Sequence, residues 1–262
     1  MSTESTAAEG RLPWEAPRGR EARPVPHLVL AWSLDEPDRL GEAVPVDGAV
    51  CLGRGGPLAD DPAPRAQPVR MRPGATRPCP PFGNARISRQ QLVLSPSGSE
   101  IRVRSVGRAA MRVNGKVAAE ATVRCGDVLE IHNAAVFLVA QRPIVLPGEA
   151  ADLGQGFAFG APDPFGIVGE SEAAWKLRAS LAFAASTDRH VLLLGESGAG
   201  KELAARAVHG LSARRSRTLV ARNAATMPES LLDAELFGNV KNYPNPGMPE
   251  RAGLVGEADG ST

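Results

Sequence analysis

The chain has 262 residues, a formal net charge of +1, 43% hydrophobic residues and 23% charged residues. This composition is typical of a globular protein with room for two domains, each able to bury a core. No run of about 18 apolar residues occurs, and the N-terminus lacks a basic segment followed by an apolar one, which argues against a membrane span and a signal peptide. We therefore expect a cytoplasmic protein.

Cysteines and histidines are few and scattered. Cys51, Cys79 and Cys125 form no Cys-x-x-Cys motif, so free thiols are expected. The four histidines form no ligand pair either. The sequence therefore predicts no metal site built from these residue types.

The first domain is predicted to be all-β. Residues 1–25 are polar and rich in Glu, Arg and Pro, which indicates disorder. Residues 26–142 then contain short β-branched segments separated by Gly, Pro, Asn and Ser, the spacing of a sandwich or barrel. The predicted strands are His27–Trp32, Gly48–Leu52, Ile87–Leu94, Glu100–Ser105, Met111–Val113, Val123–His132 and Ala135–Ala140. A Pro- and Arg-rich insert, Gly55–Asn84, is predicted to be an irregular surface loop.

This region is also strongly basic. From Arg65 to Arg124 there are twelve Lys or Arg residues, against only Glu100 and Glu120. Such an excess favours an anionic partner, whether a phosphopeptide, a nucleic acid or an acidic protein. The alternative is a solvated surface whose charge is balanced by acids elsewhere.

Several motifs in residues 26–142 resemble a forkhead-associated (FHA) domain, a β-sandwich that binds phosphothreonine peptides through loops at one end. They are Gly53-Arg54, Ser88-Arg89, Val113-Asn114-Gly115 and Cys125-Gly126-Asp127-Val128-Leu129. The resemblance implies that Arg54 and Ser88 contact the phosphate, with Arg89 as a neighbour. Arginine and hydroxyl donors suit this task, because charge-assisted hydrogen bonds contribute about 1.5 to 3 kcal/mol each.

Two positions depart from the FHA pattern. Gln91 stands where the family has the histidine of Ser-x-x-His, which bears on the loop architecture. Ala109-Ala110 replaces the Asn-Gly that contacts the peptide backbone, and alanine side chains cannot supply those hydrogen bonds. An FHA-like sandwich that serves only protein contact is therefore the alternative.

The second domain begins after a Gly-, Pro- and Ala-rich linker, residues 143–165. Ser171 is placed to cap a helix. The apolar run Val191–Leu194 predicts a strand buried on both faces, and a helix follows at Lys201. The loop between them contains Gly195, Glu196, Ser197, Gly198, Ala199 and Gly200. Glycines before a helix N-terminus and a lysine suit the phosphates of a nucleotide, although Glu202 stands where the general motif has Ser or Thr.

The rest of the chain continues the α/β pattern. Thr218–Asn223 predicts a second short strand, and Pro228 opens a helix that ends at Phe237-Gly238. We therefore predict a multidomain protein, in which an all-β FHA-like sandwich is followed by an α/β P-loop domain over residues 166–262. The resemblance described next identifies that domain as an incomplete AAA+ domain.

Residues 166–262 resemble the AAA+ ATPase domain of sigma-54-dependent transcription activators. The matching motifs are Ile167-Val168-Gly169-Glu170-Ser171, the loop Gly195–Glu202 with glutamate after the lysine, Ala204-x-Arg206-Ala207-Val208-His209 and Glu235-Leu236-Phe237-Gly238. The resemblance implies that Gly195–Glu202 binds the phosphates of ATP, with Mg²⁺, and that Ile167 and Val168 lie beside the adenine. It also implies that Asn223 is a switch restraining a catalytic glutamate, and that the full-length protein forms a ring of subunits.

Two features depart from the activator pattern. The family loop Gly-Ala-Phe-Thr-Gly-Ala, which contacts sigma-54, is replaced by Asn242–Gly247, with two prolines and a tyrosine. This replacement argues against direct contact with the sigma-54 RNA polymerase holoenzyme. The Walker B acids and the arginine finger are not found before Thr262, so we expect a fragment or a truncated protein in which catalysis is incomplete.

Three functions follow from these patterns. The first is an ATP-binding transcription regulator whose FHA-like domain senses a phosphorylated partner. The second is a phosphothreonine-binding or protein-binding adaptor with a degenerate, non-catalytic nucleotide-binding half. The third is nucleic-acid binding through the basic region, which contains few aromatic residues for stacking on bases.

Overall fold

A computed structural model describes residues 23–146, 156–243 and 245–262. The chain divides into two compact units, Met1–Ala179 and Ser180–Thr262, each of which is described by itself. The predicted disorder of residues 1–25 falls outside the described residues except at 23–25. Much of the predicted linker also falls outside them, as does Pro244 in the segment that replaces the sigma-54 contact loop.

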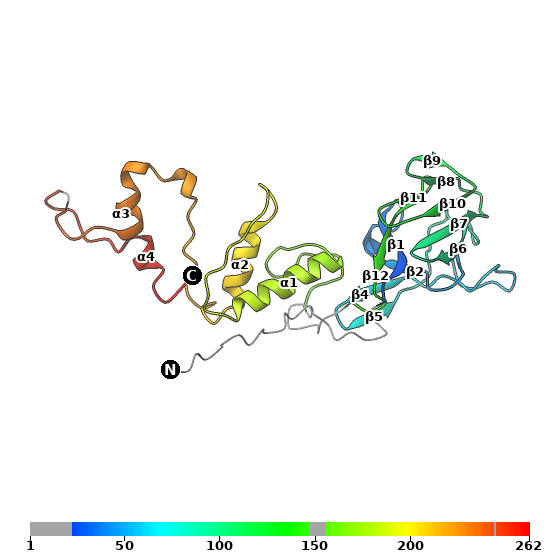
Figure 1. The fold of residues 1–262 in the computed structure, drawn as a ribbon, viewed down its shortest axis with the longest axis horizontal. Coiled ribbons are helices and arrows are strands. Elements are labelled where there is room, and N and C mark those ends of the chain that lie inside the picture. Colours follow the sequence, from blue (N-terminus) through cyan, green and yellow to red (C-terminus); the bar gives the residue numbers. More distant parts are fainter. Residues whose placement is uncertain (1–22, 147–155, 244) are drawn as a thin grey trace, which may run out of the picture. The chain divides into compact units, whose positions relative to one another are not determined.

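The first unit contains a β-sandwich of two antiparallel sheets (Figure 1), as the sequence predicts. The larger sheet has eight strands in the order β5-β4-β2-β1-β12-β11-β8-β9, and the smaller has four in the order β10-β7-β6-β3. The strands of the larger sheet are β1 (Val25–Ser33), β2 (Ala43–Pro45), β4 (Val69–Arg72), β5 (Ala75–Pro78), β8 (Met111–Val113), β9 (Lys116–Val117), β11 (Val128–Ile131) and β12 (Ala135–Arg142). Those of the smaller sheet are β3 (Val50–Leu52), β6 (Leu92–Ser97), β7 (Glu100–Ser105) and β10 (Glu120–Val123).

The core between the sheets follows from alternation along the strands. In β7, Ile101 and Val103 are buried while Arg102 and Arg104 face solvent. Phe137 of β12 is fully buried in the same apolar cluster. Each such side chain contributes about 1.5 to 3 kcal/mol on burial, so the sandwich has a substantial core of its own.

The Gly55–Asn84 insert is not wholly irregular, which corrects the sequence-based prediction. It contains the hairpin of β4 and β5, which extends the larger sheet beside β2. Val69 and Met71 are buried, while Arg70 and Arg72 alternate with them. The density of prolines concealed this alternation, and Pro78 is tolerated because β5 is an edge strand.

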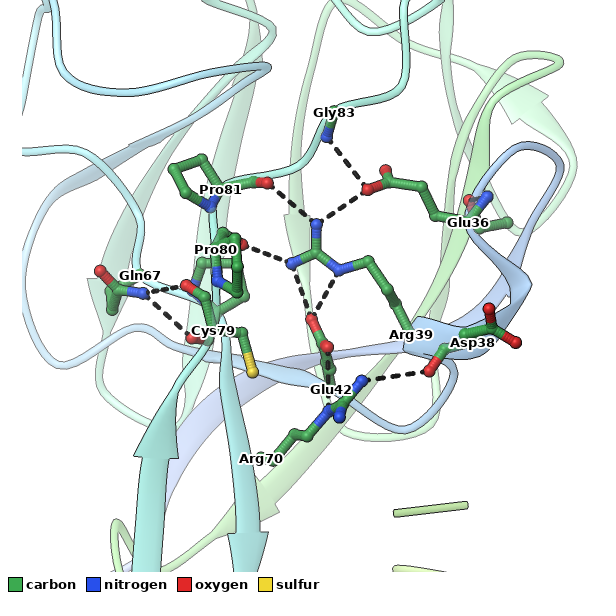
Figure 2. A network of polar contacts seen from close by, with 12 residues as sticks. Glu36, Asp38, Arg39, Glu42, Gln67, Arg70, Cys79, Pro80, Pro81 and Gly83 are labelled. Carbon is green, nitrogen blue, oxygen red and sulfur yellow. Dashed lines mark hydrogen bonds and ion pairs between the residues drawn. The ribbon is translucent and has the colours of Figure 1, made fainter. Parts of the chain in front are cut away.

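A network of polar contacts anchors the insert to the sandwich (Figure 2). The buried carboxylate of Glu42 accepts from Arg39 Nε at 2.8 Å and from Arg70 Nε at 3.1 Å. Arg39, the last residue of the short 3₁₀ turn η2 (Pro37–Arg39), also donates to Glu36 and to the carbonyls of Pro80 and Pro81. These contacts fix the chain that leads from β5 to the loop carrying Ser88.

Residues 156–178 also pack within the first unit. Phe157 and Trp175 stack with ring centroids 6.1 Å apart, and Trp175 joins a second apolar cluster with Val29 and Met71. Glu170 pairs with Arg72 at 2.6 Å and accepts from the indole N–H of Trp175 at 3.1 Å. The start of α1 (Glu172–Ala185) is therefore held by side chains of the β-sandwich.

The second unit is helical where it is regular. Its helices are α2 (Lys201–Leu211), η3 (Ala224–Thr226), η4 (Glu229–Leu231), α3 (Leu232–Phe237) and α4 (Gly253–Glu257). The helices predicted after Lys201 and Pro228 are present. Among the described residues of the whole chain, no helix is both long enough and apolar enough to cross a membrane.

The strands predicted at Val191–Leu194 and Thr218–Asn223 are not present. Leu192 is 81% exposed and Leu194 is 84% exposed. A parallel strand needs hydrogen-bonded neighbours and cover on both faces. Neither is found among the described residues around Val191–Leu194, so high local apolarity alone does not produce a strand there.

Candidate functional sites

The predicted phosphate contacts Arg54, Ser88 and Arg89 lie on two adjacent loops at one end of the sandwich, after β3 and before β6. The backbone N–H of Arg54 donates to the carbonyl of Ser88 at 2.9 Å, and its Nε donates to the carbonyl of Ile87 at 3.3 Å. Gly53 is required at this crossing, because a Cβ there would lie 1.9 Å from the carbonyl oxygen of Arg89. The fold therefore brings the three loop residues together.

Gln91 joins the loop of Ser88 to the loop between β7 and β8. Its side chain is fully buried: Oε1 accepts from the N–H of Ser88 at 3.1 Å, and Nε2 donates to the carbonyl of Ala109 at 2.8 Å. Its own carbonyl accepts from the N–H groups of Val106 and Gly107. Gln91 thus connects both loops at the position where the FHA pattern has histidine.

A cavity of about 390 Å³ opens beside Ser88. It is lined by Leu58, Asp60, Ser88, Arg89, Gln90, Val106, Gly107 and Arg108. The hydroxyl oxygen of Ser88 accepts from the backbone N–H of Arg108 at 2.9 Å, which holds the two loops at the cavity wall. Arg54 does not line this cavity, so of the three predicted contacts only Ser88 and Arg89 face it.

Sequence reasoning missed two charged residues of this cavity, Asp60 and Arg108. Arg108 directly precedes Ala109-Ala110, the positions expected to contact the peptide. It could therefore have been predicted as a site residue from the sequence. Asp60 had no such signal, because it lies in the Pro-rich insert, 28 positions before Ser88. Only the path of the folded chain places it at the cavity.

The loop Gly195–Gly200 closes around the ammonium group of Lys201. Lys201 is the first residue of α2, and its Nζ donates to the carbonyls of Gly195 at 3.0 Å and Glu196 at 2.7 Å. Gly198 and Gly200 have φ values of 79° and 82°, a region that favours glycine. The loop glycines, the lysine and the helix N-terminus therefore meet at one place.

The remaining residues of this loop support the same turn. The N–H of Ala199 donates to the carbonyl of Glu196 at 3.2 Å. Glu202 lies in the first turn of α2, and Ser197 lies within the turn before it. The carboxylate of Glu202 is favourably placed with respect to the positive end of the helix dipole.

The residues expected beside the adenine, Ile167 and Val168, belong to the first compact unit. The backbone N–H of Ile167 donates to Asp163 Oδ1 at 2.9 Å, and its carbonyl accepts from Arg178 at 2.8 Å. Arg178 and Asp163 also form a buried ion pair at 2.9 Å. Ile167 is thereby fixed, while the side chain of Val168 is 61% exposed.

Asn223, the expected switch residue, is exposed and caps the 3₁₀ turn η3. Its Oδ1 accepts from the N–H of Ala225 at 3.0 Å. This is the local hydrogen bond of an N-cap, which satisfies an otherwise unpaired N–H group. In this structure Asn223 is bonded to its own turn.

The segment that replaces the sigma-54 contact loop lies within a closed loop. Asn239 and Arg251 exchange backbone hydrogen bonds of 3.0 and 2.9 Å at its base. Asn242 has a positive φ of 66°, and its Oδ1 accepts from the N–H of Gly247 at 3.0 Å. Tyr243 is 66% exposed near the tip. The loop therefore presents one aromatic side chain on a hydrogen-bonded frame.

Comparison with known proteins finds a family model that matches the C-terminal part of the chain. Residues 167–262 match the family model described as the Sigma-54 interaction domain. The chain is 45% identical over 96 residues to the transcriptional regulator VasH of Vibrio cholerae, and 47% identical over 98 residues to the transcriptional regulatory protein ZraR of Salmonella typhimurium. Each match covers 37% of this chain, and the chain spans 18% of VasH and 22% of ZraR, about a fifth of their length.

The β-sandwich is similar to solved FHA domains. One is the FhaA FHA domain in complex with the intracellular domain of Rv3910, at 17% identity and a TM-score of 0.30, covering 44% of this chain and 98% of that one. Another is the FHA domain of an Arabidopsis thaliana hypothetical protein, at 14% identity and a TM-score of 0.33, covering 48% of this chain and 94% of that one.

Proposed function

We propose that this protein is a transcription regulator of the sigma-54 activator type, because residues 167–262 match the Sigma-54 interaction domain and the chain is up to 48% identical to named regulators over about 98 residues. In this proposal the second unit binds ATP and the β-sandwich recognises a phosphorylated protein. Such a regulator works beside RNA polymerase in the cytoplasm. Self-association into a ring, as the family resemblance implies, is part of the same proposal.

The observation that supports ATP binding is that three features suited to phosphate meet at Lys201. Its ammonium group, the positive-φ glycines Gly198 and Gly200 and the N-terminus of α2 suit a phosphate chain. Lys201 would exchange the carbonyls of Gly195 and Glu196 for phosphate oxygens. Mg²⁺ would arrive with the nucleotide and neutralise part of its phosphate charge.

The test of ATP binding is calorimetric titration of the full chain with a non-hydrolysable ATP analogue and Mg²⁺. Lys201→Ala should weaken binding about 10- to 100-fold, since a charge-assisted hydrogen bond contributes about 1.5 to 3 kcal/mol. Lys241→Ala, an exposed lysine in the 239–251 loop, is the matched control and should bind like the wild type. Equal affinity of wild type and Lys201→Ala would contradict the proposal.

Phosphopeptide recognition is supported by the cavity beside Ser88. Two guanidinium-bearing residues, Arg89 and Arg108, line it together with the Ser88 hydroxyl. A phosphate can accept from all of these groups. Arg54 supports the Ser88 loop through its bonds to the backbone of Ile87 and Ser88.

Matched phosphothreonine and threonine peptides test this part of the proposal. Phosphorylated peptides should bind, and their unphosphorylated forms should not. Ser88→Ala and Arg89→Ala should each reduce the affinity about tenfold or more, as expected for lost hydrogen bonds to a charged group. Arg77→Ala, an exposed arginine on β5, is the control and should leave binding unchanged. If no phosphopeptide from a degenerate library binds, the sensor function is wrong.

An adaptor without ATPase activity is the second candidate. It is favoured by the closed 239–251 loop, where Asn242–Gly247 replaces the family's contact sequence and argues against a direct sigma-54 contact. A sigma-54 binding assay with Tyr243→Ala distinguishes the two. Binding that depends on Tyr243 supports a regulator with an altered contact loop, whereas no binding, together with retained phosphopeptide binding, supports the adaptor.

A further inference from the structure

A turn in the insert, Leu58–Asp61, contacts the loop that carries Ser88. Asp61 accepts from the N–H of Leu58 at 2.8 Å, from Arg65 at 2.8 Å and from the side-chain amide of Gln90 at 3.2 Å. Burial opposes ionisation of Asp61, but these donors outweigh it and lower the pKa of the carboxyl group. The turn therefore carries a fixed, charged anchor.

This anchor places Asp60 at the cavity beside Ser88. The amide of Gln90 also donates to the backbone carbonyl of Asp60 at 3.0 Å, so the backbone of this exposed residue is held in place. Among the described residues, the Asp60 carboxylate has no ion pair, although it lines the same cavity as Arg89 and Arg108.

The cavity lining thus combines charges of both signs with apolar side chains. Arg89 and Arg108 supply positive charge near the Ser88 hydroxyl, and Asp60 supplies the negative charge. Leu58 and the exposed Val106 add apolar side chains to the same lining. Lysine and arginine side chains match such a surface, because their methylene stems pack on apolar groups while the charged head reaches an acid.

We infer that Asp60 is a specificity-determining residue, which selects phosphopeptides that carry a lysine or arginine close to the phosphorylated residue. The phosphate binds at Ser88, Arg89 and Arg108, and the basic side chain lies along Leu58 and Val106 toward Asp60. This inference rests on the proposed phosphopeptide function. It also implies that acidic residues at the same peptide position are rejected, since they would face Asp60.

The experiment uses the full chain and pairs of phosphothreonine peptides that differ only by lysine or alanine, with the variable residue placed at each flanking position in turn. The wild type should prefer lysine over alanine about three- to fivefold at one or two positions, the range of a partly exposed ion pair. The preference should decrease at high salt, because exposed charges are screened.

Two variants identify the residue responsible. Asp60→Asn keeps the backbone carbonyl that Gln90 uses and should abolish the preference for lysine, while binding of the alanine peptide is retained. Asp60→Lys should reverse the preference toward glutamate. The matched control, Asp47→Asn, changes an exposed aspartate outside the cavity and should keep the wild-type preference.

The outcomes separate this inference from the proposed function. If phosphopeptides bind but lysine gives no advantage at any position, or if Asp60→Asn keeps the advantage, the inference is wrong and the phosphopeptide function stands. If Asp60→Asn strengthens binding of all phosphopeptides equally, Asp60 is a general repulsive charge and the inference is also wrong. If no phosphopeptide binds, the proposed function itself fails.

Discussion

Among single residues, Gln91 connects the two loops that border the cavity beside Ser88. It is buried, and it satisfies the N–H of Ser88 and the carbonyl of Ala109 at once. A histidine ring is not needed for this purpose, because an amide offers both a donor and an acceptor. The substitution of histidine by Gln91 is therefore compatible with a linked pair of loops.

Gln91→Leu should destabilise the first unit by about 1 to 3 kcal/mol, because it leaves two partly buried backbone groups without partners. Urea unfolding followed by the intrinsic fluorescence of Trp175 measures the change. Gln141→Leu removes a solvent-exposed bond to Ser99 and should cost less than about 0.5 kcal/mol. Similar losses for the two variants would show that Gln91 has no special role.

His27 makes the stability of the first unit depend on pH. Its ring is fully buried and bonds to the carbonyl of Val25 at 2.8 Å. Burial lowers the pKa of His27 and outweighs the opposing hydrogen bond with Val25; the charge of Arg142 lowers this pKa further, and that of Asp47 opposes the shift weakly. Below about pH 6.5 the imidazole of His27 is therefore protonated in the unfolded state but remains neutral in the folded state until a lower pH.

Stability should be constant above about pH 6.5 and should fall on acidification by up to about 1.4 kcal/mol per pH unit until the lowered pKa of His27 is reached. Urea midpoints measured between pH 7.5 and 5 test this, with His27→Gln expected to remove that part of the slope. His190→Gln, an exposed histidine in the second unit, should keep it. An unchanged slope in His27→Gln would assign the pH dependence to other groups.

At the scale of elements, the β4–β5 hairpin binds the segment that leads into α1. Arg72 pairs with Glu170 and lies over the rings of Phe157 and Trp175, with its guanidinium carbon 4.5 and 5.4 Å from their centroids. The side chain of Glu170 is only 5% exposed. A buried carboxylate without its cation is costly, so the hairpin and this segment depend on each other.

Arg72→Ala should therefore loosen residues 157–178 and destabilise the first unit by about 3 kcal/mol or more. Hydrogen exchange of peptides from this segment, measured by mass spectrometry, should be faster in the variant. Arg77→Ala, on the neighbouring strand β5, should exchange like the wild type. Unchanged protection in Arg72→Ala would mean that the ion pair does not hold the segment in solution.

At the scale of the whole molecule, the two compact units differ in how much apolar surface they bury. The sandwich has a contiguous core, whereas the second unit exposes Leu192, Leu194 and Phe237. Regions with few buried apolar contacts open at lower free energy than well-packed ones. The two units should therefore not unfold together.

We expect urea to unfold the second unit first, with residues 23–146 protected to higher concentrations. Pulsed hydrogen exchange with mass spectrometry resolves the two transitions. The ATP analogue with Mg²⁺ at about 100 times its Kd should stabilise the second unit against unfolding by about 2.7 kcal/mol, and Lys201→Ala should remove this stabilisation. A single cooperative transition, with or without nucleotide, would contradict this picture.

The local residue pattern was enough to predict several strands, a helix cap and a turn. Short β-branched segments between turn-forming residues predicted β7 and β8 at their observed bounds, and Ser171 was predicted as a helix cap, which its bond to the N–H of Ala174 confirms. The turn before Lys201 and the helix after it also followed from local spacing. In each case neighbouring residues carry the information, because they set the side-chain period and the backbone freedom.

Features that involve residues far apart in the sequence could be recognised only in the folded chain. The hairpin inside the insert and the missing strand at Val191–Leu194 were both mispredicted, because strand formation depends on which partner lies alongside. The cavity beside Ser88 combines Asp60 from the insert with Arg108 from the loop after β7, and Gln91 connects the loops around it. Such contacts arise from the path of the folded chain, which no local period encodes.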